Sequence, residues 1–215
     1  MEEKSVNPTS HKAMTACGSR PLKGVLEVIC GPMFSGKSEE LIRRLRRAKI
    51  AQQKVVSFNP HVDTRTALHT ITSHNGASLE AITISDPLTI STHIDFDVEV
   101  VGIDEVQFFS PEIINVVFDL VEQGKRVIVT GLNLDFRGVP FGTIPIFMAI
   151  ADTVTKLSAI CIMCGTDAYL TQRIVDGTPA RYDDPIVKPG AQEAYQARCR
   201  SCHIVDKKPV WQKTL

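Results

Sequence analysis

The stretch GPMFSGKS, residues 31–38, constrains the fold of this chain more than any other feature. It comes directly after the apolar run VLEVIC, residues 25–30, and before a segment with apolar residues at helical spacing. The stretch fits the pattern G-x-x-x-x-G-K-S/T, in which glycines let backbone N–H groups turn inward around an anion. A helix that begins near Gly36 points the positive end of its dipole at the same place. The sequence therefore predicts a strand, an anion-binding loop and a helix, in that order.

The residues of this loop have distinct expected roles in binding a nucleoside triphosphate. Lys37 places a positive charge on the β- and γ-phosphates, and the Ser38 hydroxyl can ligate Mg²⁺. A chance match to the pattern is the alternative, and the strand before the loop and the helix after it argue against that alternative. We assign ATP and Mg²⁺ binding to the whole stretch: Gly31, Pro32, Met33, Phe34, Ser35, Gly36, Lys37 and Ser38.

Strands and helices alternate over the first two thirds of the chain. The predicted strands are residues 24–30, 54–59, 98–104, 126–131 and 152–160, and the predicted helices are 36–53 and 111–125. Ser110 and Pro111 stand where an N-cap and a first helical residue are expected, and residues 60–80 are predicted to form a long polar loop. Near-continuous apolar strands that alternate with helices indicate a parallel sheet covered on both faces. The predicted fold class is therefore α/β, a P-loop parallel sheet.

Two acidic residues follow the apolar strand that ends the stretch VEVVGID. They are Asp104 and Glu105, and acids at the end of a strand are often without a function. In a chain that also has a phosphate loop, one acid is expected to orient Mg²⁺ and the other is free to act as a general base. We assign the first role to Asp104 and the second to Glu105. Attack by water would make the protein an ATPase and attack by a substrate hydroxyl would make it a kinase, and the acids alone do not distinguish these.

Four cysteines form two C-x-x-C pairs, Cys161 with Cys164 and Cys199 with Cys202. Four thiolates at this spacing are typical of a structural Zn²⁺ site, whereas a redox pair needs one C-x-x-C and buried free thiols need no spacing. His203 adjoins Cys202 and is an alternative ligand, but Cys202 completes the symmetric spacing. Because 34 residues lie between the two pairs, the metal is expected to staple a lasso-like loop that can cover a small substrate.

Composition and charge set the remaining expectations. The 215 residues carry no formal net charge, which gives no indication of nucleic acid as a partner, and no apolar run reaches the ~18 residues of a membrane span. The run RRLRR, residues 43–47, is expected to be a solvated or subunit-contact face of a helix. The polar first residues lack a secretory h-region, so we expect a cytoplasmic protein. The predicted units are a disordered tail (1–23), a nucleotide-binding domain (24–157), a zinc-binding lid (158–205) and a C-terminal tail (206–215).

The motifs GPMFSGKS, DEVQFF and FRGVPFG, followed by the cysteine pairs with YDDP between them, occur here in the order that resembles one family. The chain is similar over about residues 24–205 to the thymidine kinases of the zinc-containing cellular type. The resemblance implies transfer of the ATP γ-phosphoryl group to the 5′-hydroxyl of deoxythymidine, with Mg²⁺ and a structural Zn²⁺. It also implies a homotetramer and feedback inhibition by dTTP.

The resemblance assigns further residues. Glu105 would be the base, Asp104 the metal partner, and Arg65 in VDTR the arginine near the transferred phosphate, with Gln107 of DEVQFF among the ATP and Mg²⁺ residues. The thymine pocket would be formed by Met33, Phe108, Leu132, Phe136, Thr171 and Tyr195, with backbone hydrogen bonds from the loop near Val187.

The chain departs from the family pattern at Thr66, where an aromatic residue is common, and at Lys188 and Pro189, where a more apolar turn is usual. Two other functions use the same motifs. A zinc-bearing ATPase that acts on nucleic acid would need a basic surface and salt-dependent binding. A silent nucleotide sensor would not need the two acids, the lysine and the serine together.

Overall fold

The structure is a computed structural model, and it describes residues 23–61, 70–72, 76, 78–186 and 194–207. Its centre is a six-stranded sheet in which every strand pair is parallel, in the order β5-β2-β6-β7-β1-β8. The strands are β1 (Val25–Cys30), β2 (Val55–Pro60), β5 (Ile82–Ile84), β6 (Val100–Ile103), β7 (Arg126–Gly131) and β8 (Thr153–Lys156). The predicted parallel α/β sheet is confirmed.

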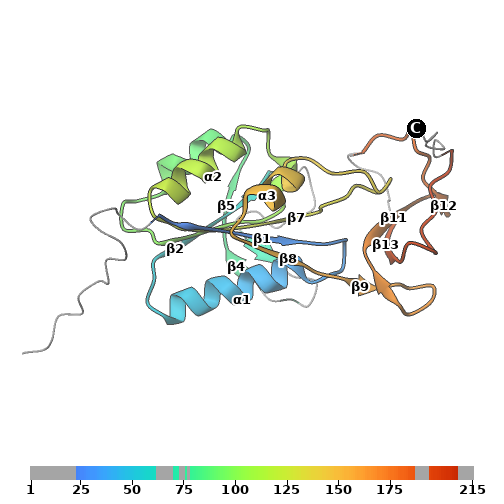
Figure 1. Cartoon of the computed structure of the whole chain (residues 1–215), viewed down its shortest axis with the longest axis horizontal. Helices are drawn as coiled ribbons and strands as arrows, with labels where there is room; N and C mark the ends of the chain where they lie inside the picture. The colour runs from blue at the N-terminus through green and yellow to red at the C-terminus, as the bar shows by residue number, and fades with distance from the viewer. Residues whose placement is uncertain (1–22, 62–69, 73–75, 77, 187–193, 208–215) are drawn as a thin grey trace, which may run out of the picture.

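Helices cover both faces of this sheet (Figure 1). Helix α1 (Lys37–Ile50) packs on one face, and α2 (Ile113–Glu122) and α3 (Ile144–Ile150) pack on the other. Side chains of β1 alternate between the two layers, because successive residues of a strand point to opposite faces. Val28 belongs to the apolar cluster under α2 and α3, whereas Ile29 belongs to the cluster under α1. Burial on both faces explains why the central strands are apolar throughout.

Several elements differ from the sequence predictions. The loop predicted at residues 60–80 contains a short antiparallel pair, β3 (Thr70–Thr72) with β4 (Ser78–Glu80). Helix α2 begins at Ile113 rather than at Pro111, and no side chain caps it. The 3-10 helix η1 (Pro87–His93), strand β5 and helix α3 were not predicted. A three-residue strand shows too little alternation to be recognised, and the all-apolar α3 shows no helical periodicity.

The segment predicted as one strand over residues 152–160 is divided into β8 and β9 (Ala159–Ile160). Between them the N–H of Leu157 donates to the carbonyl of Cys30 at 2.7 Å, and β9 then pairs with β10 (Asp167–Ala168). Strand β8 therefore closes the central sheet, and β9 begins the small sheets. The three-stranded sheet beyond it contains β11 (Leu170–Val175), β12 (Thr178–Pro179) and β13 (Ala194–Arg198). The unit boundary near residue 158 stays a prediction.

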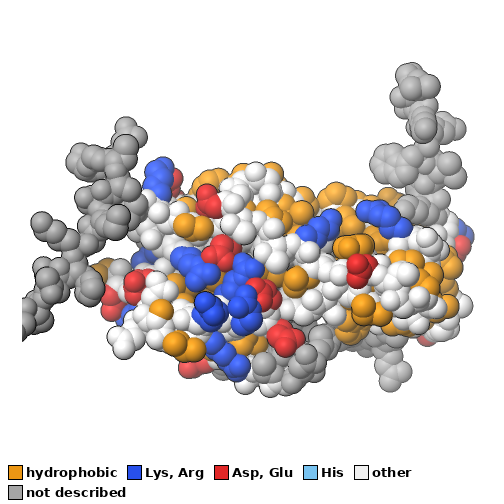
Figure 2. Space-filling model, turned by 60° about the horizontal axis from the view of Figure 1, so that its bottom comes forward, with side chains coloured by type: hydrophobic (Ala, Val, Ile, Leu, Met, Phe, Trp, Pro, Cys, Tyr) orange, Lys and Arg blue, Asp and Glu red, His pale blue; other side chains and the backbone are white. Residues whose placement is uncertain are grey.

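Arginines of α1 gather with acidic side chains on one face of the protein (Figure 2). Arg44 donates to Glu27 at 2.7 Å and to Glu40 at 2.8 Å, and Arg126 of β7 donates to Glu27 at 2.6 Å. The predicted charged helix face is therefore a network of ion pairs. None of the described helices has the length and apolar character needed to cross a bilayer.

Candidate active site

The loop between β1 and α1 lies at the edge of the sheet where the parallel strands end. We call residues 31–36 the glycine-rich loop. Gly36 has φ of 81°, a conformation that favours glycine, and a Cβ at Gly31 would lie 2.7 Å from the carbonyl oxygen of Leu157. Lys37, the first residue of α1, donates from its Nζ to the loop carbonyl of Pro32 at 2.9 Å, and the lysine side chain is buried. The positive charge of Lys37 is therefore held against the loop.

A buried carboxylate at the end of β6 faces the first turn of α1. The Ser38 hydroxyl donates to Asp104 Oδ2 at 2.9 Å, and the Thr130 hydroxyl at the end of β7 donates to Asp104 Oδ1. The N–H of Glu105 also donates to Oδ1, at 3.0 Å. A hydroxyl and a carboxylate side by side are hard oxygen ligands of the kind Mg²⁺ prefers, so Ser38 and Asp104 fit a magnesium site. The contact with Thr130 was not predicted, because nothing in the apolar strand singles that residue out.

Glu105 follows Asp104 in a left-handed backbone conformation, with φ of 48°. Its carboxylate accepts a hydrogen bond from the Gln107 side-chain amide. Burial raises the pKa of Glu105 above its ordinary value; the Lys37 charge opposes this rise, the Asp104 charge adds to it and the Gln107 hydrogen bond opposes it. A left-handed backbone conformation is uncommon for a residue other than glycine, and such residues gather at functional sites.

The residues predicted to surround a pyrimidine come from three places. The N–H of Met33 in the glycine-rich loop donates to Thr171 Oγ1 at 3.0 Å, which joins the loop to β11. Phe108 is 36% exposed and meets Phe141 edge to face, with ring centroids 5.8 Å apart. The N–H of Leu132 donates to Gln107 Oε1 at 3.1 Å. Phe141 was missed by the sequence reasoning, although it stands in the quoted motif FRGVPFG.

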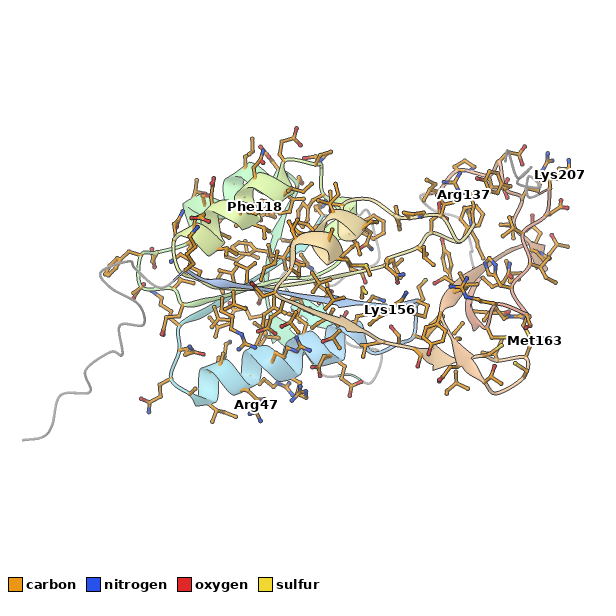
Figure 3. The ribbon with its side chains drawn as sticks, in the orientation of Figure 1. Arg47, Phe118, Arg137, Lys156, Met163 and Lys207 are labelled. Carbon is orange, nitrogen blue, oxygen red and sulfur yellow. The ribbon has the colours of Figure 1, made fainter. Side chains whose placement is uncertain are left out.

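Phe136 and Tyr195, both predicted to contact the pyrimidine, have different surroundings in the structure. Phe136 is buried, and the Arg173 guanidinium carbon lies 5.1 Å from its ring centroid. Tyr195 pairs in register with Arg173 across β11 and β13, and it lines a shallow apolar groove together with Phe34. Figure 3 shows Arg137, whose guanidinium carbon lies 6.0 Å from the Phe136 centroid, on the side of the protein that carries the small sheets. The predicted residues Arg65 and Val187 lie outside the described residues.

The four paired cysteines come together in space. Their sulfur atoms all lie within 4.8 Å of one another, and the Sγ atoms of Cys164 and Cys199 are 3.6 Å apart. Four sulfurs about 2.3 Å from one zinc ion would stand roughly 3.8 Å apart, so the set Cys161, Cys164, Cys199 and Cys202 could hold Zn²⁺. His203 Nε2 instead lies 2.9 Å from the carbonyl oxygen of Phe136. The geometry thus favours Cys202 over His203 as the fourth ligand.

Comparison with known families agrees with this arrangement. The family model described as thymidine kinase matches residues 24–203. That match spans both the central sheet and the cysteine cluster, and it defines the protein as a kinase, which is a transferase. The chain belongs to the thymidine kinase family, and its four-cysteine cluster is consistent with the zinc-containing cellular type. Thymidine and a nucleotide phosphate donor are the substrates that this family implies.

Proposed function

We propose that the protein transfers the γ-phosphoryl group of ATP to the 5′-hydroxyl of deoxythymidine and so forms dTMP for pyrimidine salvage. The family match supports phosphorylation of thymidine. One observation supports ATP as the phosphate donor and Glu105 as the base. At the end of the parallel strands, the side chains of four residues lie close together: Lys37, Ser38, Asp104 and Glu105. This combination offers a cation, a magnesium site and a base within one short edge of the sheet.

The glycine-rich loop would hold the triphosphate. Its backbone N–H groups and the start of α1 suit an anion, and Lys37 adds a positive charge beside it. Ser38 and Asp104 would hold Mg²⁺, which neutralises charge on the phosphate oxygens when it is bound. Phe34 and Ser35, whose hydroxyl donates to the Pro32 carbonyl at 2.8 Å, would complete the loop around the phosphates.

Glu105 would act as the general base. Its carboxylate takes the proton of the 5′-hydroxyl as the oxygen forms its bond to the γ-phosphorus, and the bond to the bridging oxygen of ADP breaks. The raised pKa of Glu105 makes it a better proton acceptor than an exposed glutamate. Arg65 would stabilise charge on the transferred phosphoryl group.

The thymine base would lie between the glycine-rich loop and the small sheets. Met33 and Thr171 join these two parts, and Phe108 offers a partly exposed ring. Leu132, Tyr195 and the backbone near Val187 would complete the pocket. Phe136 would serve as its outer wall, since its ring is already packed against Arg173.

The cysteine cluster would hold Zn²⁺ in a structural role. It ties β9 and the turn that follows it to the end of β13, so the ends of the intervening segment are fixed. We further propose a cytoplasmic homotetramer that is inhibited by dTTP, as the family resemblance implies. Nucleic acid is disfavoured as a partner, because arginines on the basic face of α1 form ion pairs within the protein. Arg43 pairs with Glu40, and Arg44 pairs with both Glu27 and Glu40.

The test is a product assay with Mg²⁺ and ATP over a panel of nucleosides. We expect dTMP and ADP to form in equal amounts, and little ADP when no nucleoside is present. Glu105→Gln is expected to lower turnover by about 10²- to 10⁴-fold, the usual contribution of a general base. ADP formation that does not depend on the nucleoside would indicate an ATPase and overturn the proposal. Full activity of Glu105→Gln would overturn the assignment of the base.

A further inference from the structure

We infer that Gln107 is a positioning residue for phosphoryl transfer, because its side-chain amide holds the Glu105 carboxylate in place. The inference rests on the proposed role of Glu105 as the base. The family motif places Gln107 among the nucleotide-binding residues, but its contacts in the structure point to Glu105. Gln107 lies in the 3-10 helix η2 (Val106–Phe108), and its side chain is buried.

The orientation of the Gln107 amide is determined by its surroundings. The backbone N–H of Leu132 can only donate, so the atom 3.1 Å from it must be the amide oxygen of Gln107. The NH₂ group is then left to face Glu105, where it donates to the carboxylate. Both ends of the amide therefore have partners of the correct kind. An amide in this setting is fixed in one orientation rather than free to flip.

The space around Gln107 is also closed. A Cβ at Gly131 would lie 2.2 Å from Gln107 Oε1, and a Cβ at Gly142 would lie 2.7 Å from the Gln107 carbonyl oxygen. Gly142 in addition has φ of 53°, which disfavours any larger residue. The two glycines make room for Gln107 from two different segments of the chain. A side chain that served only to fill space would not need the polar contact at each end.

A fixed amide at this place has a direct consequence for Glu105. One carboxylate oxygen is engaged by Gln107, which leaves the other oxygen to meet a substrate hydroxyl. A donor also favours the ionised carboxylate, the form that a base requires. Lys37 and Asp104 are the other charged groups that act on this carboxylate among the described residues. Gln107 is the neutral one, so it can orient the base without changing the charge of the site.

The experiment replaces Gln107 in two ways and measures kcat and KM separately. Gln107→Met keeps the length but removes both hydrogen bonds, and Gln107→Glu keeps the shape but replaces the N–H donor by a carboxylate, which adds a negative charge beside Glu105. We expect kcat to fall about 10- to 100-fold in both variants, as for loss of a hydrogen bond to a charged group. The KM values for ATP and thymidine are expected to change by less than about threefold, because the residue acts through Glu105.

A matched control comes from the small sheets. Gln172 is likewise buried, and its amide makes three hydrogen bonds: it accepts from the N–H of Ile204 at 2.8 Å and donates to the carbonyls of Ile204 and Arg173 at 2.7 and 3.1 Å. Gln172→Met removes these three hydrogen bonds, none of which involves Glu105. It is expected to lower the thermal midpoint as Gln107→Met does and to keep kcat within about threefold of the parent. An equal loss of kcat in this control would mean that loss of stability alone explains the effect, and it would overturn the inference.

Combining Gln107→Met with Glu105→Gln separates the inference from the proposed function. If Gln107 acts through Glu105, the double variant has the same kcat as Glu105→Gln alone, because two residues that act as a unit are not additive. Multiplied losses in the double variant, or unchanged kcat in Gln107→Met and Gln107→Glu, would overturn the inference while the base assignment stands. Full activity of Glu105→Gln would overturn the proposed function itself.

Discussion

The central sheet and the small sheets around the cysteines stay folded for different reasons. The sheet has an apolar layer on each face, with α1 on one side and α2 and α3 on the other. Among the described residues, the cluster around the cysteines buries Ala159, Cys161, Ala168 and Ala197, with Cys199 and Cys202 packed against it. A cluster of that size provides little hydrophobic stabilisation, so we expect a bound metal to provide most of the stability of the small sheets. The comparison indicates that the central sheet is stabilised by apolar packing, whereas the small sheets are expected to depend on a metal held by the four cysteines.

The largest expected effect comes from removing the zinc ion that we propose for the four-cysteine cluster. Cys199→Ser, or treatment with a strong chelator, is expected to unfold the small sheets and abolish kinase activity, since structural zinc sites contribute about 10–16 kcal/mol of binding free energy. The central sheet is expected to remain folded. Hydrogen exchange resolved by segment, together with zinc analysis, measures both parts.

A buried cysteine outside the cluster provides the control for metal removal. Cys30→Ala at the end of β1 is expected to keep the zinc content unchanged, because this thiol belongs to the central core. A Cys199→Ser protein that keeps its small sheets protected from exchange would contradict the assigned role of the metal.

The next effect tests the other region. Leu45 of α1 is fully buried against the sheet, and a Cβ added at Gly102 would lie only 2.6 Å from its Cδ1. Leu45→Ala is expected to lower the free energy of unfolding by about 2–5 kcal/mol and to leave the zinc content unchanged. Urea unfolding followed by circular dichroism measures it. Ile50→Ala on the same helix, where the side chain is 81% exposed, is expected to cost less than about 0.5 kcal/mol.

A third, smaller effect lies at the contact between the two regions. Thr171→Val keeps the shape of the side chain but leaves the partly buried N–H of Met33 without its acceptor, which is expected to cost about 1 kcal/mol. Thermal unfolding measures the loss, and a raised KM for thymidine is expected with it. Thr171→Ser keeps the hydroxyl and serves as the control. Equal effects of valine and serine would show that the hydrogen bond does not join the regions.

The smallest effect concerns acid stability of the central region. Burial raises the pKa of Glu27, but the hydrogen bonds and charges of Arg126 and Arg44 outweigh it and lower the pKa below its ordinary value. The Arg43 hydrogen bond is the largest cause that lowers the pKa of Glu40, to about 2, with Arg44 adding to it. A carboxylate with a lowered folded-state pKa stabilises the protein above its unfolded pKa, and this stabilisation disappears as the pH falls through the folded value.

We therefore expect the urea concentration at the unfolding midpoint to decrease as the pH is lowered from about 5 to about 2, that is, from the ordinary carboxylate pKa downward. In Glu27→Gln the midpoint is expected to be lower at neutral pH and to depend less on acid. A parent protein and a Glu27→Gln protein with the same pH dependence would show that this carboxylate does not contribute.

The two regions also differ in how far the sequence predicted them. Strand β7 was predicted with its observed bounds, since an apolar run between a helix and a glycine has one simple interpretation. The cysteine cluster was predicted from spacing alone, because four thiols at this spacing suit a metal. The contacts of Thr130, Phe141 and Gln107 were not predicted, since they depend on which strand ends lie side by side. That information is carried by the sheet order β2-β6-β7-β1 and not by any local pattern.

The central claim is that Glu105 removes the proton of the 5′-hydroxyl while ATP is held by the glycine-rich loop. A single-turnover measurement tests it most directly, with the enzyme in excess over radiolabelled thymidine and with saturating ATP and Mg²⁺. The account predicts that Glu105→Gln binds thymidine with unchanged affinity and forms dTMP at least about 100-fold more slowly than the parent protein. An unchanged rate of dTMP formation in that variant would contradict the account.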